Sequence, residues 1–169
     1  AGQYQLTGGT LQGLLDYVPN LQLLGGSVLL NPTYQTNGTI ARLDLNGATL
    51  ASSNRVSGVL NLFSGKISGS LVVGSNAVLN WYGGRFDGPG LTIESNGVGN
   101  LLGSSQKDLG GCFTNAGQVM WSAGTISILN NASTLFGAIE NQPGGAWDVQ
   151  GDLSINQFSV NNYATFRNR

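Results

Sequence analysis

A short repeat that recurs about every 20 residues is the feature that most constrains how this chain can fold. Its template is an apolar–polar–apolar triplet, two free positions, a glycine, a small polar or basic residue, and a further apolar residue. The triplet alternates its side chains between two faces as a short strand does, and the glycine allows the chain to turn. Eight copies align, with triplets at residues 4–6, 21–23, 43–45, 60–62, 79–81, 99–101, 119–121 and 147–149.

Two of the copies depart from the template, and a further one starts near the last residue. The sixth lacks the glycine and continues with Ser104, Ser105 and Gln106. In the eighth copy the second half, Gly151–Asp152–Leu153, arrives one residue early. The pair Phe166–Arg167 looks like the start of a ninth copy.

Most copies contain a second short apolar stretch followed by a corner. The stretches are residues 71–73, 91–93 and 112–114, and corners with asparagine before glycine or alanine follow, as at Asn76–Ala77 and Asn96–Gly97. Asparagine and glycine tolerate the left-handed conformation that such corners need. Two or three short strands in about 20 residues leave no room for a helix. We therefore predict an all-β, single-stranded parallel β-helix (β-solenoid) of about eight coils of roughly 20 residues, in one domain over residues 1–169.

The predicted coils stack like residues into columns. One expected column is Leu62, Trp81, Leu101, Trp121 and Val149, and a second is Ile67, Phe86, Gln106, Ile126 and Leu153. Right-handed winding is expected from the handedness of parallel crossovers. The rival fold is an antiparallel β-sandwich or barrel, because Asn-Gly turns also mark hairpins. The constant phase of the template favours the solenoid, since alternate strands of a sandwich lie in different environments.

Composition excludes several classes of function. The chain has no histidine, one cysteine, and a net charge of −1. A Ser-His-Asp or Cys-His centre and an ordinary zinc site therefore cannot be built, and we expect no metal and no cofactor. No basic patch suits nucleic acid, and no apolar run is long enough to span a membrane. The chain begins at Ala1 rather than Met, which suggests a processed protein or a piece of a longer one.

Three phrases resemble the glycine- and asparagine-rich repeats of large secreted bacterial surface proteins of the autotransporter or adhesin type. They are GSNAVLNWYGGRF, CFTNAGQVMWSAGTI and VNNYATFRNR, and the resemblance covers the chain from about residue 40 to its end. It implies a parallel β-helix and a location outside the cell or on the bacterial surface. Because members of such families differ in activity, the resemblance bears on architecture and location more than on function.

Four charged residues make up the candidate catalytic site of the alternative function, a polysaccharide lyase or glycosidase. Such enzymes use carboxylates with lysine or arginine on an exposed face. Asp87 and Asp108 fall at similar offsets in adjacent coils, and Lys66 and Arg85 share one slot. The competing interpretation is that these are scattered, solvated charges on turns, and we expect no catalytic site.

Binding candidates are few. The column Asn61, Asn80 and Asn100 is expected to form a side-chain amide ladder, with a glycan-binding strip as the alternative. The tryptophans occupy apolar slots, so we expect them in the core, whereas Tyr82 has the opposite phase and is the candidate for ligand stacking. Ice binding is disfavoured because Lys66 and Arg85 interrupt any flat array of hydroxyl groups.

An uncapped solenoid exposes unpaired backbone groups and core side chains at each end. No amphipathic cap is visible, so we expect the open ends to contact other copies of the chain or adjoining repeats of a longer one, with glycans as further partners. The expected function is a non-enzymatic stalk, spacer or end-to-end filament subunit; the alternative is a carbohydrate-binding or polysaccharide-degrading domain. Any recognition is expected in the irregular stretches 14–20, 31–39 and 132–143.

Overall fold

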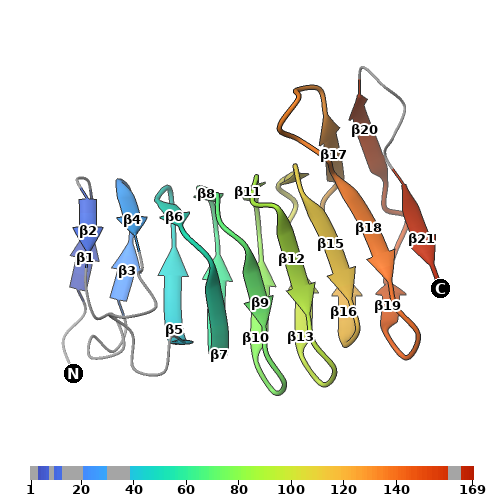
Figure 1. The fold of residues 1–169 in the computed structure, drawn as a ribbon, viewed down its shortest axis with the longest axis horizontal. Coiled ribbons are helices and arrows are strands. Elements are labelled where there is room, and N and C mark those ends of the chain that lie inside the picture. Colours follow the sequence, from blue (N-terminus) through green and yellow to red (C-terminus); the bar gives the residue numbers. More distant parts are fainter. Residues whose placement is uncertain (1–3, 8–9, 13–20, 30–38, 160–164) are drawn as a thin grey trace.

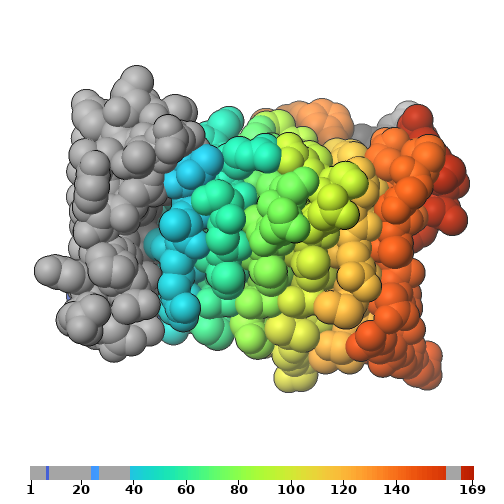
Figure 2. Space-filling model, turned by 90° about the horizontal axis from the view of Figure 1, so that it is seen from below, coloured from blue at the N-terminus to red at the C-terminus, as the bar shows by residue number. Residues whose placement is uncertain are grey.

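The computed structural model describes residues 4–7, 10–12, 21–29, 39–159 and 165–169, and every regular element in these residues is a β-strand. The described strands pair in parallel, and consecutive segments of the chain follow one another as slabs along the long axis (Figure 2). The protein is a parallel β-solenoid, with about 4 turns of about 20 residues. This arrangement excludes the antiparallel sandwich for the described part of the chain.

Three strand-bearing faces surround the core. The first face continues through strands whose triplets were predicted from the repeat (Figure 1). Its members are β1 (Tyr4–Leu6), β3 (Leu21–Leu23), β5 (Thr39–Leu45), β7 (Asn54–Leu62), β10 (Val78–Trp81), β13 (Val98–Leu101), β16 (Gln118–Trp121) and β19 (Ala146–Val149).

The second face is a separate eight-stranded sheet. It contains β2 (Thr10–Gln12), β4 (Ser27–Leu29), β6 (Thr49–Ala51), β8 (Lys66–Ile67), β11 (Gly84–Phe86), β14 (Lys107–Leu109), β17 (Ile126–Asn130) and β20 (Ile155–Ser159).

The third face joins the first through the long strands β5 and β7. The beginning of β7 pairs with β9, whereas its end pairs with β10, so that one strand serves two faces. Beyond β7 the third face continues through β9 (Leu71–Val73), β12 (Gly90–Ile93), β15 (Cys112–Asn115), β18 (Ala138–Asn141) and β21 (Phe166–Asn168).

The first predicted column is confirmed. Leu62, Trp81, Leu101, Trp121 and Val149 are consecutive register partners on the first face. Their side chains are buried as far as Trp121, and Trp147 packs against the same core. The strict alternation of buried and half-buried residues in β10, β12 and β13 follows from the pleat, which sends neighbouring side chains to opposite faces.

The second predicted column is correct only at its start. Ile67 and Phe86 are register partners, but the next position holds Leu109, followed by Ile128. Gln106 is exposed, Ile126 pairs with Lys107, and Leu153 lies outside any strand. The physical reason is loop length: the sixth copy has a longer connection before its second strand, which moves the core position three residues along the chain.

The expected ninth copy is also wrong. Phe166 pairs with Ile139 on the third face, so β21 completes the last turn and does not begin a new one. Of the irregular stretches, residues 14–20 and 31–38 lie outside the described residues, and Thr39 begins β5. The stretch 132–143 is shorter than expected, because residues 138–141 form β18.

The corners use the residues that the sequence indicated. Asn76 and Asn96 have φ values of 62°, and Gly65, Gly84 and Gly124 also adopt positive φ. No helix in the described residues is long and apolar enough to cross a membrane.

Candidate functional site

A ladder of side-chain amides runs along the outside of the first face. Asn80 donates to Oδ1 of Asn61 at 2.8 Å, and Asn100 donates to Oδ1 of Asn80 at 2.8 Å. Asn61 in turn donates to Oδ1 of Asp44 at 2.6 Å. The predicted ladder is confirmed and gains a carboxylate at one end. At the other end Met120 takes the next register position, and in the described part of the chain the buried Oδ1 of Asn100 has no hydrogen-bond partner.

A second ladder, which the sequence reasoning missed, lies at the corner between the third and first faces. Asn115 donates to Oδ1 of Asn141 at 2.7 Å, and Asn141 donates to Oδ1 of Asn168 at 2.8 Å. Asn115 and Asn141 are buried, and each also donates to a backbone carbonyl, of Ala146 and Gly145 respectively. The signal that could have found it is the asparagine that ends the third-face strand in each of the last turns.

We expect Asn80→Ala to lower the free energy of unfolding by about 1–3 kcal/mol, because the change removes two hydrogen bonds and leaves half-buried amides without those partners. Urea denaturation followed by circular dichroism measures the effect. Asn131→Ala, at an exposed asparagine outside the ladders, is the control and should change stability by less than about 0.5 kcal/mol. Equal stability of the two variants would contradict a stabilising ladder.

Three of the four charged candidates, Lys66, Arg85 and Asp108, lie on the second face, and the predicted shared slot of Lys66 and Arg85 is confirmed. Arg85 pairs in register with both Lys66 and Asp108, so one outward column holds all three. Asp87 lies outside this column, and the expected alignment of Asp87 with Asp108 is wrong because of the longer connection in the sixth copy. The Asp87 carboxylate, 13% exposed, binds Nζ of Lys66 at 3.1 Å and Nε of Arg85. Asp108 accepts a hydrogen bond from Gln106 at 2.6 Å. The charge of the Asp87 carboxylate is therefore neutralised by the two neighbouring cations.

Tyr82 points away from the core, as its phase suggested, but it is half-buried because it stacks on Phe63 of the preceding turn. The ring centroids are 4.8 Å apart with an interplanar angle of 20°. Phe63 is exposed, so the pair forms a small aromatic surface at the corner between the first and second faces. Trp81 and Trp121 are core residues, as predicted.

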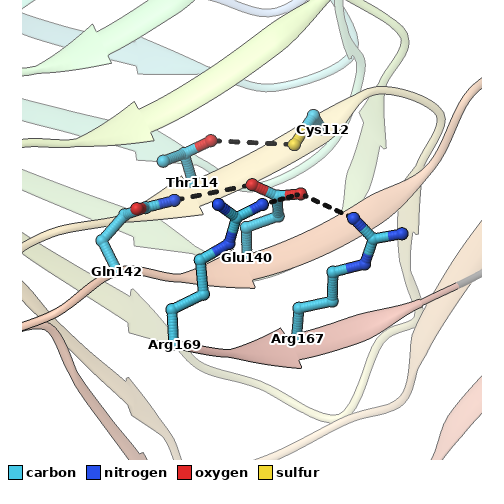
Figure 3. A network of polar contacts seen from close by, with 6 residues as sticks. All are labelled: Cys112, Thr114, Glu140, Gln142, Arg167 and Arg169. Carbon is cyan, nitrogen blue, oxygen red and sulfur yellow. Dashed lines mark hydrogen bonds and ion pairs between the residues drawn. The ribbon is translucent and has the colours of Figure 1, made fainter.

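Two ion-pair groups link turns on the third face. Arg55 donates to Oε1 of Glu94 at 2.6 Å, and this hydrogen bond lowers the pKa of the Glu94 carboxyl. Figure 3 shows the second group, in which Glu140 faces Arg167 at 3.7 Å and Arg169 at 3.5 Å. Cross-strand pairs of this kind add to the register that the backbone already fixes.

Lys107 is a buried cation that the sequence reasoning overlooked. Its side chain is fully buried, and the three N–H groups of Nζ are shared among four carbonyl oxygens: Ser105 at 3.0 Å, Gly103 at 3.2 Å, and Tyr82 and Ala123 at 3.3 Å. These carbonyls come from the same corner of three successive turns. Among the described ion pairs none involves Lys107, and burial lowers the pKa of its ammonium group to about 8.

The last turn exposes apolar side chains whose register partners in the preceding turn are buried. Val149, Ile155, Phe158 and Phe166 are 40–51% exposed. A hollow of about 330 Å³ opens beside Val149 and Phe166, and Trp147 and the ladder residues Asn141 and Asn168 also line it. We call this surface the C-terminal end face.

No group of three or more potential metal ligands of the kinds His, Cys, Asp and Glu occurs within the described ranges. No family model, curated protein sequence or solved structure matches this chain. The resemblance to bacterial surface repeats therefore stays a prediction, and function has to be argued from the geometry.

Proposed function

We propose that this protein is a non-enzymatic structural or adhesive element outside the cell or on the bacterial surface, a rigid stalk, spacer or filament subunit. In this proposal the solenoid is right-handed and has eight coils. The coil count is supported by the order of the second face, which continues through β2, β4, β6, β8, β11, β14, β17 and β20. The handedness is supported by the strong preference of parallel β crossovers for right-handed connections.

The observation that carries the proposal is the C-terminal end face. Four apolar side chains and the last amide of a ladder stand where another turn would cover them, beside β19, β20 and β21, which end their sheets within the described residues. An exposed apolar patch at the edge of a parallel sheet suits a further layer of parallel strands. Strands β1 and β2 occupy the same register columns as β19 and β20, so a second copy placed end-on continues both faces.

The lyase or glycosidase alternative has less support. Its best carboxylate, Asp87, is largely covered and already neutralised by two cations. Glycan binding, unlike catalysis, needs no free acid.

End-to-end stacking is tested with charges on the end face. We expect the wild-type chain to form rods in electron micrographs and to show concentration-dependent association by sedimentation velocity. Phe158→Asp and Phe166→Asp should weaken association by at least about tenfold, since each places a carboxylate in an apolar contact.

Phe136→Asp is the matched control, because Phe136 is 71% exposed and lies in the loop before β18, outside the strand columns. It should associate like the wild type. A wild-type chain that stays monomeric at high concentration would overturn end-to-end stacking, as would equal weakening by the control.

A further inference from the structure

One corner between the third and first faces is two residues shorter than its neighbours. β12 ends at Ile93 and β13 begins at Val98, and β18 and β19 are likewise separated by residues 142–145. Between them, β15 ends at Asn115 and β16 begins at Gln118, which leaves Ala116 and Gly117 as the whole corner. In Figure 1 the loops at the ends of β13 and β19 extend further than the one at β16.

Backbone hydrogen bonds show which positions are missing. The first residue of a corner donates its amide to the residue that ends the third-face strand of the preceding turn, as Gln142 N does to Asn115 O. Ala116 N donates to Ile93 O in the same way, so Ala116 is the first position of its corner. The last residue of a corner accepts a hydrogen bond from the amide of the next turn, as Gly97 O does from Gln118 N. Gly117 O accepts from Ala146 N in the same way, so Gly117 is the last position of its corner. The two middle positions, held by Ser95 and Asn96 in the preceding turn, have no counterpart.

This gap is a groove of about 420 Å³. Its polar side chains are those of Ser95, Asn96 and Gln118, and Gly97, Gly117 and Gly144 also line it. The volume falls within the range of about 300–1,000 Å³ that is typical of small-ligand sites.

The walls of the groove are held in place by hydrogen bonds. Gly97 N donates to Glu94 O at 2.8 Å, and Gly145 N donates to Gln142 O at 2.9 Å on the other side. Asn76 N donates to Asn96 O at 3.0 Å, which ties one wall to the turn before it. A ligand would therefore meet a formed site and would not have to order it, which favours binding.

We propose that this groove binds one or two sugar residues of a neutral oligosaccharide. None of the residues that line it is charged, and an ionised ligand would lose water without gaining a counter-charge. The hydroxyl of Ser95 and the amides of Asn96 and Gln118 offer donors and acceptors together, as sugar hydroxyls require. This inference is independent of end-to-end stacking.

The test is a nuclear magnetic resonance titration of the ¹⁵N-labelled full chain with maltose, cellobiose and chitobiose, and with digalacturonate as the acidic probe. We expect at least one neutral disaccharide to shift the amides of Gly97, Gly117 and Gln118 saturably, and digalacturonate to leave them unchanged. No shift with any neutral probe, or equal shifts with digalacturonate, would overturn the proposal.

Two variants make the test specific. Asn96→Gly keeps the positive φ and removes the amide, so it should weaken binding at least tenfold, whereas Asn76→Gly, with the same φ one turn earlier, should not. Inserting Ser-Asn between Ala116 and Gly117 restores a four-residue corner, which should fill the groove and abolish the shifts. Unchanged binding by the insertion variant would place the ligand elsewhere and reject the site.

Discussion

Gly88→Ala is expected to lower the free energy of unfolding by about 3–5 kcal/mol, the largest effect that we predict for a single added methyl group. Gly69, Gly88 and Gly111 stack at the corner between the second and third faces. A Cβ on Gly88 would overlap the carbonyl oxygen of Gly69, and one on Gly111 would overlap that of Gly88. Because these oxygens belong to the backbone, they cannot move aside without changing the spacing of the turns.

Gly90→Ala provides the matched control two residues along the same turn. Its added Cβ would lie 4.0 Å from the Cys112 carbonyl oxygen, which is ordinary contact, so stability should change by less than about 0.5 kcal/mol. Urea denaturation of both variants separates close backbone approach from a general effect of replacing glycine. A Gly88 variant as stable as the Gly90 variant would show that the turns are less closely stacked at this corner.

Lys107→Met is expected to lower the free energy of unfolding at pH 7 by about 2–3 kcal/mol, because four part-buried carbonyl oxygens lose their charged donor. The second expected result is a change in pH dependence. The unfolded lysine stays protonated up to its ordinary pKa near 10.5, whereas burial lowers the pKa in the folded protein to about 8. Between these values the unfolded state binds more protons, so this residue makes stability rise with pH, by up to about 3 kcal/mol.

The measurement compares wild type and variant by urea denaturation from pH 7 to pH 10.5. Subtracting the two unfolding free energies cancels the titration of all groups that the wild type and the variant share. Because Lys107 then remains as the only titrating difference, the wild type should become more stable relative to the variant as the pH rises above 8. Lys66→Met is the control for the loss of a lysine as such, because Lys66 is partly exposed and lies outside the contacts of Lys107. A difference that does not vary with pH would contradict a lowered pKa at Lys107.

The core position after Phe86 illustrates how far the repeat alone could be followed. Anchoring the sixth copy on its triplet placed Gln106 in the core, whereas the structure places Leu109 there. A better anchor was in the sequence, since glycine follows the core residue by two positions at Gly69, Gly88 and Gly111. With that anchor Lys107 falls two positions before Leu109, on the same face of the strand and therefore inside.

The first amide ladder was predictable because its asparagines occupy the middle of a regular triplet. The second was less visible, because the register column that holds Asn115 and Asn141 holds Val73 and Ile93 in the earlier turns. A column that changes from apolar to amide side chains has no periodic signal, and the register of neighbouring turns has to be known before it can be recognised.

The sequence by itself determined the strands, the solenoid and the first-face columns, because alternation within a triplet and recurrence of the triplet are properties of a short stretch of chain. Only the tertiary structure decided that Lys107 is buried under four carbonyls, that Asp87 is neutralised by two cations, and that a short corner at Ala116 and Gly117 opens a groove. The burial of Lys107 and the groove depend on differences in loop length between adjacent turns, which set what lies above and below a residue, and the pairing of Asp87 depends on how far the Lys66 and Arg85 side chains reach.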